Sequence, residues 1–131
     1  MRVLNLATGR QVTAELPEGR SAANAAFSPD GSFLAVEVSF SNEADDGGQA
    51  VQLELVSIAS GHLTTVPRTW VSSNALIGFG WPASSESLVA ELGFTTKVQL
   101  ASWRPGGGRL ALAVIRPRQS PASLVIGQYA P

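Results

Sequence analysis

Short apolar runs, separated by turn-forming residues, make up most of the chain. In the stretch AAFSPDGSFLAVEV (25–38), Pro29, Asp30 and Gly31 stand between two such runs. Pro fixes φ at about −65°, Asp can bond its own downstream backbone, and Gly accepts a positive φ, so these residues predict a tight turn. The flanking runs are rich in β-branched and aromatic residues, which favour strands. The stretch therefore predicts a β-hairpin.

The same pattern predicts β-structure along the whole chain, because Gly and Pro interrupt every segment long enough for a stable helix. The apolar runs and the turn residues between them predict short strands along most of the chain. We therefore expect an all-β, antiparallel fold.

Two types of hairpin alternate along the chain, and one of them carries the motif Val-Gln-Leu. VQLELVSIASGHL (51–63) matches VQLASWRPGGGRL (98–110) without a gap, and VLNLATGRQV around Gly9 is a shorter copy. Gly61 follows Gly9 by 52 residues, and Gly108 follows Gly61 by 47. A period of roughly 50 residues with two hairpins means four strands per repeat, which is typical of propeller blades.

The hairpin with the Ser-Pro-Asp-Gly turn recurs in weaker form as GFGWPASSESLVAEL (78–92). Trp81 precedes Leu88 by seven residues, just as Phe27 precedes Leu34, and Trp81 follows Phe27 by 54 residues. We therefore expect Trp81 to occupy the position of Phe27, next to the core between blades.

FSPDGSFLAV (27–36) resembles the aromatic-Ser-Pro-Asp-Gly-x-x-Leu-Ala element of WD-repeat-like bacterial β-propellers of the TolB type. VLNLATGR (3–10) and VQLELVSIASGH (51–62) are similar to that family's Val-x-Leu…Thr-Gly element, which joins the last two strands of a blade. The Trp-Asp dipeptide of the eukaryotic relatives is missing. The resemblance implies four-stranded antiparallel blades and a role chiefly as an interaction platform.

On that template the chain is a single β-propeller segment (1–131) of about two and a half blades. The expected parts are the outer half of a blade at 1–16, complete blades at 21–67 and 73–116, and one strand of a further blade at 121–131. The template implies strands at 2–6, 11–16, 22–28, 33–40, 50–58, 62–66, 74–81, 87–93, 97–103, 109–115 and 122–129. A closed propeller typically needs about four or more blades. We therefore expect the segment to belong to a longer propeller or to complete one as a homo-oligomer.

Two alternatives stay open at this point. SWRPGGGRLALAV (102–114) also aligns with AFSPDGSFLAVEV (26–38), so residues 98–115 could form the first hairpin of a blade rather than the last. The period of roughly 50 residues favours the last hairpin. An independent small β-sandwich or an open antiparallel sheet would also satisfy the strand pattern.

Composition narrows the classes of function. Nine basic residues, eight of them Arg, and ten acidic residues leave a net charge of −1, so no basic stripe is available for nucleic acid. Cysteine is absent, which excludes disulfides and Cys-based zinc sites, and no apolar run approaches the roughly 20 residues of a membrane span. We expect a soluble protein without a cofactor and without membrane insertion. The Arg bias fits a GC-rich bacterial genome and leaves the compartment, cytoplasmic or extracytoplasmic, undetermined.

Catalytic and metal sites have little support in the sequence. His62, the only histidine, falls at a predicted hairpin turn, and no Gly-x-Ser-x-Gly element is present, so we expect no catalytic residue. The loop SNEADDGGQA (41–50) gathers Glu43, Asp45 and Asp46, whose carboxylates are of the type that binds Ca²⁺. Their spacing fits no EF-hand, so a solvated loop is the expectation there.

The glycines of RPGGGR (104–109) could bring backbone amides close to an anion. A phosphate-binding loop of the P-loop type needs Gly-Lys-Ser/Thr at the start of a helix. A strand pattern follows instead, so this segment predicts a hairpin turn.

Exposed aromatic residues are the remaining candidates for binding, and the tryptophans are Trp70, Trp81 and Trp103. Trp70 stands beside Arg68 in PRTWVSS, the connection between two predicted blades. A loop aromatic with a nearby Arg is a reasonable binding pair. We take Trp70 and Arg68 as candidate binding residues, with a staple between blades as the alternative for Trp70.

Three glutamates, Glu37, Glu54 and Glu91, lie within otherwise apolar strands, and Glu37 and Glu91 occupy matching places in their repeats. Paired carboxylates for glycoside chemistry would need a suitable separation and a raised pKa on one of them. Strand alternation explains them better as residues on the solvent side of their sheets.

The function expected first is a non-catalytic scaffold that binds a protein or peptide through loops at one end of the blades. A second hypothesis is the propeller segment of a hydrolase or peptidase whose reactive groups lie elsewhere. A third is a sensor that binds a small ligand or sugar with loop aromatics. The fold alone cannot choose among them.

Overall fold

The computed structural model describes residues 1–6, 8–42, 48–72, 75–83, 86–94, 97–107 and 109–115. Within these residues it contains eleven strands, which are β1 (Arg2–Leu4), β2 (Gln11–Thr13), β3 (Arg20–Phe27), β4 (Phe33–Asn42), β5 (Gly48–Ser57), β6 (Leu63–Thr65), β7 (Val71–Ser72), β8 (Leu76–Gly80), β9 (Leu88–Phe94), β10 (Lys97–Trp103) and β11 (Arg109–Ile115). All pairings among them are antiparallel. The all-β prediction is confirmed, and the predicted strand at 122–129 lies outside the described residues.

No helix in the described part of the chain is long and apolar enough to cross a membrane.

The strands form three sheets, each following chain order. β1 pairs with β2, each strand from β3 to β6 pairs with the next one along the chain, and the same holds from β8 to β11. Short turns produce this arrangement, because they join antiparallel neighbours directly. The hairpin at 98–115 therefore supplies the third and fourth strands of its sheet.

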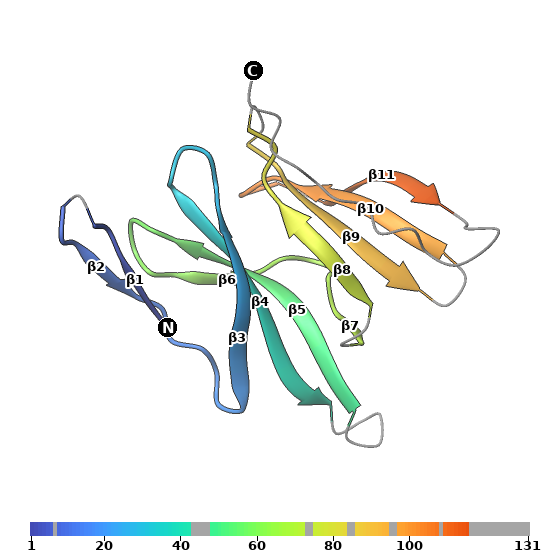
Figure 1. The fold of residues 1–131 in the computed structure, drawn as a ribbon, viewed down its shortest axis with the longest axis horizontal. Helices are drawn as coiled ribbons and strands as arrows, with labels where there is room; N and C mark the ends of the chain where they lie inside the picture. The colour runs from blue at the N-terminus through green and yellow to red at the C-terminus, as the bar shows by residue number, and fades with distance from the viewer. Residues whose placement is uncertain are drawn as a thin grey trace.

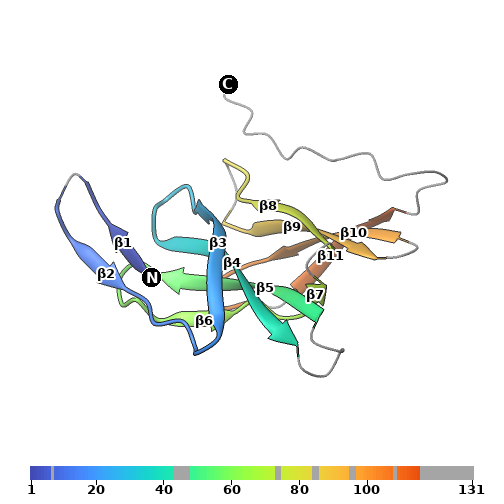
Figure 2. The same ribbon diagram turned by 60° about the horizontal axis from the view of Figure 1, so that its bottom comes forward.

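The three sheets are stacked face to face, with the β3–β6 sheet in the middle (Figures 1 and 2). Successive side chains of a strand point to opposite faces of its sheet, and β4 and β5 carry apolar residues at positions of both kinds, so both faces of this sheet are apolar. Val36 and Val38 of β4 face the β1–β2 hairpin and are fully buried there with Ala14. Ala35, and Leu53 of β5, belong to the core shared with the β8–β11 sheet. The middle sheet thus holds the two outer ones together.

The β1–β2 hairpin lies close against the β5–β6 turn. Arg10 donates a hydrogen bond from Nη2 to the carbonyl of Ala59, at 3.0 Å. Gly61 has a φ of 76°, and a Cβ at that position would collide with the backbone of Thr13 in β2. This turn therefore needs glycine both for its conformation and for the close approach of the hairpin.

The outer edge of the middle sheet differs from the prediction of a single strand at 62–66. Two short strands pair with successive parts of β5, β6 opposite residues 54–56 and β7 opposite residues 50–51. The chain leaves the edge between them, where Pro67 has no amide hydrogen to contribute and Arg68 adopts a φ of 59°. The sheet consequently has five strands rather than four.

The side chain of Thr69 bridges this interruption. Its Oγ1 accepts a hydrogen bond from the N–H of Leu53 at 3.1 Å and donates one to the carbonyl of Val66 at 2.7 Å. The N–H of Val66 in turn donates to the carbonyl of Leu53 at 2.9 Å. Thr69 is buried, so water cannot pair with these backbone groups. Its hydroxyl supplies the hydrogen bonds that an edge strand would otherwise make, and it keeps the Leu53 N–H and the Val66 carbonyl paired.

We predict that Thr69→Val lowers the free energy of unfolding by about 2–3 kcal/mol, because it leaves a buried N–H and a buried carbonyl without partners. Thr69→Ser retains the hydroxyl and should cost less than about 1 kcal/mol. Urea denaturation followed by tryptophan fluorescence would measure both variants. Equal losses for the two would show that the hydroxyl does not hold this edge together.

Candidate functional site

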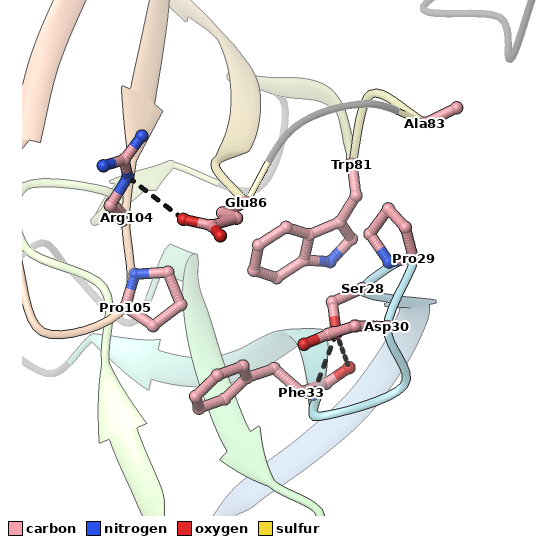
Figure 3. A pocket seen from close by; sticks show the side chains of 9 residues that line it. All are labelled: Ser28, Pro29, Asp30, Phe33, Trp81, Ala83, Glu86, Arg104 and Pro105. Atoms are coloured by element: carbon pink, nitrogen blue, oxygen red, sulfur yellow. Dashed lines mark hydrogen bonds and ion pairs between the residues drawn. The ribbon is translucent and has the colours of Figure 1, made fainter.

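Turns from both larger sheets come together at one end of the stack, because alternate turns of an antiparallel meander lie at the same end. A cavity of about 430 Å³ lies there, lined by Ser28, Pro29, Asp30, Phe33, Trp81, Ala83, Glu86, Arg104 and Pro105 (Figure 3). A second cavity, of about 610 Å³, is lined by Phe33, Leu55, Thr64, Thr65, Pro67, Trp103, Pro105, Gly106 and Gly107. Since Phe33 and Pro105 belong to both walls, we call the two cavities together the turn groove.

The Ser-Pro-Asp-Gly turn forms one side of the turn groove. Ser28 donates a hydrogen bond from Oγ to Oδ1 of Asp30 at 2.6 Å, and the N–H of Ser32 donates to the same oxygen at 3.0 Å. The N–H of Phe33 donates to Oγ of Ser28 at 2.9 Å, and Gly31 has a φ of 70°. The predicted tight turn is thus confirmed, with its polar groups largely bonded to one another.

These hydrogen bonds also set the charge of the turn. The bonds from Ser28 and then Ser32 lower the pKa of Asp30 to about 2. Hydrogen bonds to a carboxylate favour its charged form, so Asp30 is ionised throughout the physiological range. The turn therefore places a fixed negative charge at the wall of the groove.

Trp81 joins the two larger sheets beside this turn. Its side chain is 5% exposed, it belongs to the core shared by the sheets, and its Nε1 donates to the carbonyl of Ala26 in β3 at 3.1 Å. The predicted core position of Trp81 is therefore confirmed. Figure 3 shows its indole ring lying between Glu86 and Pro29 at the edge of the first cavity. Trp103 is likewise a core residue and lines the second cavity.

Glu86 and Arg104 bring opposite charges to the first cavity from two connections of the β8–β11 sheet. Glu86 Oε2 lies 4.0 Å from Arg104 Nε, with side-chain exposures of 85% and 65%. A pair this exposed is weak, because water and salt screen it and two long side chains must be ordered. Sequence reasoning missed both residues. Arg104 lies in the segment predicted as a hairpin turn and was weighed there only for phosphate binding, and nothing local marks Glu86.

The predicted binding pair lies elsewhere. Trp70 and Arg68 are exposed on the connection between β6 and β7, and neither lines the turn groove. A binding role for them stays a prediction.

The other predicted candidates occupy turns. His62 is exposed in the β5–β6 turn, where its N–H donates to Oγ of Ser60 at 3.2 Å. Residues 104–107 form a turn after β10, as predicted. The acidic loop residues Glu43, Asp45 and Asp46 lie outside the described residues.

The predicted solvent exposure of the strand glutamates is wrong for Glu54 and Glu91, each of which is 2% exposed. Glu54 lies on the face of β5 that the β1–β2 hairpin helps to cover, so alternation does not bring it to water. It pairs with Arg20 at 3.2 Å and accepts a hydrogen bond from Oγ1 of Thr65 at 3.0 Å. Glu37 is half-buried, and its Oε2 accepts a hydrogen bond from Nδ2 of Asn24 at 2.6 Å.

Burial changes the titration of both buried carboxyls. It raises the pKa of Glu54, an effect partly offset by the hydrogen bond from Thr65 and the charge of Arg20. Burial also raises the pKa of Glu91, whose Oε2 has no hydrogen-bond partner.

No protein-family model matches the chain, and the comparison with curated proteins gives no significant match.

We predict that Glu91→Gln raises the melting temperature at pH 8 by a few degrees and that this gain shrinks toward pH 4. The folded state binds the Glu91 proton more tightly than the unfolded chain, so the stability linked to this group is present at low pH and lost as pH rises through the folded pKa. Thermal unfolding monitored by circular dichroism at several pH values would test this. The matched variant Glu86→Gln, at an exposed carboxyl, should show a much smaller gain at pH 8. A gain for Glu91→Gln that does not depend on pH would contradict the assignment.

Proposed function

We propose that the chain is a segment of a β-propeller that acts as a non-catalytic scaffold and binds a peptide or protein partner in the turn groove. The observation that carries this proposal is the groove itself, whose walls combine aromatic rings, prolines and a few charges contributed by turns of two sheets. Sites of this kind, largely preformed on a rigid framework and about 300–1,000 Å³ in volume, are typical of ligand binding.

The contrast between Trp81 and Phe27 supports the propeller architecture. The two residues occupy matching positions in their repeats, and Trp81 is buried against the sheet that precedes it. Phe27 is 55% exposed, although the β1–β2 hairpin packs on the same middle sheet. If β1 and β2 are the outer pair of a blade, the inner pair would cover Phe27. Those strands would come from a longer chain or from a second copy of this one.

The shape of the turn groove favours an extended ligand. Its two cavities lie next to each other and share Phe33 and Pro105 in their walls. Aromatic and proline side chains present apolar area at a low cost in conformational entropy, and peptide-binding domains use them for this reason. An extended peptide could place neighbouring residues in the two cavities.

We predict that peptides selected on the protein from an unbiased displayed library lose affinity by about tenfold or more on Ala83→Trp. Ala83 is exposed and lines the first cavity, so a bulky side chain there obstructs the groove without entering the core. Ala59→Trp, at an exposed position in the β5–β6 turn, is the matched control and should keep the affinity. Fluorescence anisotropy would measure both variants. Undiminished binding by Ala83→Trp would place the peptide site outside the groove.

We predict that the isolated chain self-associates through the surface around Phe27 and that Phe27→Arg reduces its mass in solution. The same change should alter the free energy of unfolding by less than about 1 kcal/mol, because the side chain is already half exposed. Light scattering after size exclusion would measure the mass, with Trp70→Arg as a control at a comparably exposed aromatic. A wild-type chain that stays monomeric at high concentration would contradict assembly of copies through this surface.

A further inference from the structure

We propose that the first cavity of the turn groove binds a basic side chain of an extended peptide, while apolar residues next to that side chain occupy the second cavity. This inference rests on the proposed peptide-binding function and adds the chemistry of the peptide. Three observations carry it, namely the charges in the first cavity, the aromatic rings beside them and the uncharged lining of the second cavity.

The first cavity has an excess of negative charge. Among the described residues that line it, Asp30 and Glu86 are acidic and Arg104 is basic. Arg104 can neutralise at most one of the two carboxylates, and it approaches Glu86 only to 4.0 Å in a largely exposed pair. Asp30 has its hydrogen bonds within its own turn, so it stays charged and fixed in place. A cation is the complementary ligand for this arrangement.

The aromatic walls favour a cation carried on an organic side chain over a bare ion. Trp81 and Phe33 border the same space as Asp30 and Glu86 in Figure 3. The face of an aromatic ring attracts an ammonium or guanidinium group, and the methylene stem of the same side chain packs along apolar surface beside it. The protein makes such contacts itself, with Arg20 at 4.8 Å from the centre of the Phe40 ring.

The second cavity has different chemistry. Its lining contains no charged residue among those described, and Leu55, Pro67 and Trp103 give it apolar walls. Thr64 and Thr65 add hydroxyl groups at one side. A ligand that spans both cavities would therefore combine one basic group with uncharged, mainly apolar neighbours. A peptide segment has this combination along one extended chain, whereas a small cation does not.

The test uses three pools of acetylated pentapeptides with random flanking residues and a central Arg, Gln or Glu. Each pool is passed over immobilised wild-type protein and over the groove-blocked variant Ala83→Trp, and retained peptide is quantified by mass spectrometry. We expect the Arg pool to be retained about tenfold more than the Gln pool, the Glu pool to be retained least, and Ala83→Trp to abolish these differences.

A second variant ties the preference to Asp30. Asp30→Asn keeps the side-chain oxygen that accepts the bonds from Ser28 and Ser32, so the turn is retained while the charge is lost. It should reduce the Arg preference several-fold, whereas Glu18→Gln, which removes an exposed charge that does not line the groove, should not. Equal retention of the Arg and Gln pools, with retention still dependent on an open groove, would overturn the inference and leave peptide binding intact. Retention of no pool above the level of Ala83→Trp would overturn both proposals.

Discussion

The β3–β6 sheet and the β8–β11 sheet are held together by an apolar core to which both contribute, since neither could otherwise bury the apolar face it turns toward the other. Their shared core includes small and branched side chains from β4, β5 and β9, together with the indole rings of Trp81 and Trp103. One directional bond adds to this packing, from the indole N–H of Trp81 to the carbonyl of Ala26. Apolar burial is non-directional, so such a bond helps to select one relative position of the sheets among those that bury similar area.

The turn groove follows from this stacking. Phe33 comes from the middle sheet, whereas Trp81, Arg104 and Pro105 come from the β8–β11 sheet and its turns. Neither sheet alone has both walls. Two parts of the walls are bonded internally, the Ser-Pro-Asp-Gly turn through Ser28 and Asp30 and the turn after β10 through the N–H of Gly107 and the carbonyl of Arg104, so these parts do not have to be ordered before a ligand can bind.

Local sequence was sufficient to predict the strands, because Pro, Asp and Gly in a tight turn and apolar runs on either side act over a few residues. The edge of the middle sheet was not predictable in this way. Its second short strand, β7, depends on Thr69 reaching Leu53, which is 16 positions away in sequence. The burial of Glu54 was missed for a related reason. Alternation says which face of a sheet a residue lies on, and only the stacking of sheets decides whether water reaches that face.

The candidate site was even less accessible to sequence reasoning. An aromatic residue in a predicted loop, such as Trp70, can be read from the sequence. Glu86 and Arg104 become candidate site residues only because two separate turns bring them to the same cavity. Because the groove walls belong to different sheets, a ligand that contacts both also crosses the interface that holds the sheets together. Such a ligand stabilises the stacked state over any state in which the sheets separate, in proportion to its affinity for the closed groove. Binding in the groove and cohesion of the two sheets are therefore coupled properties of one interface.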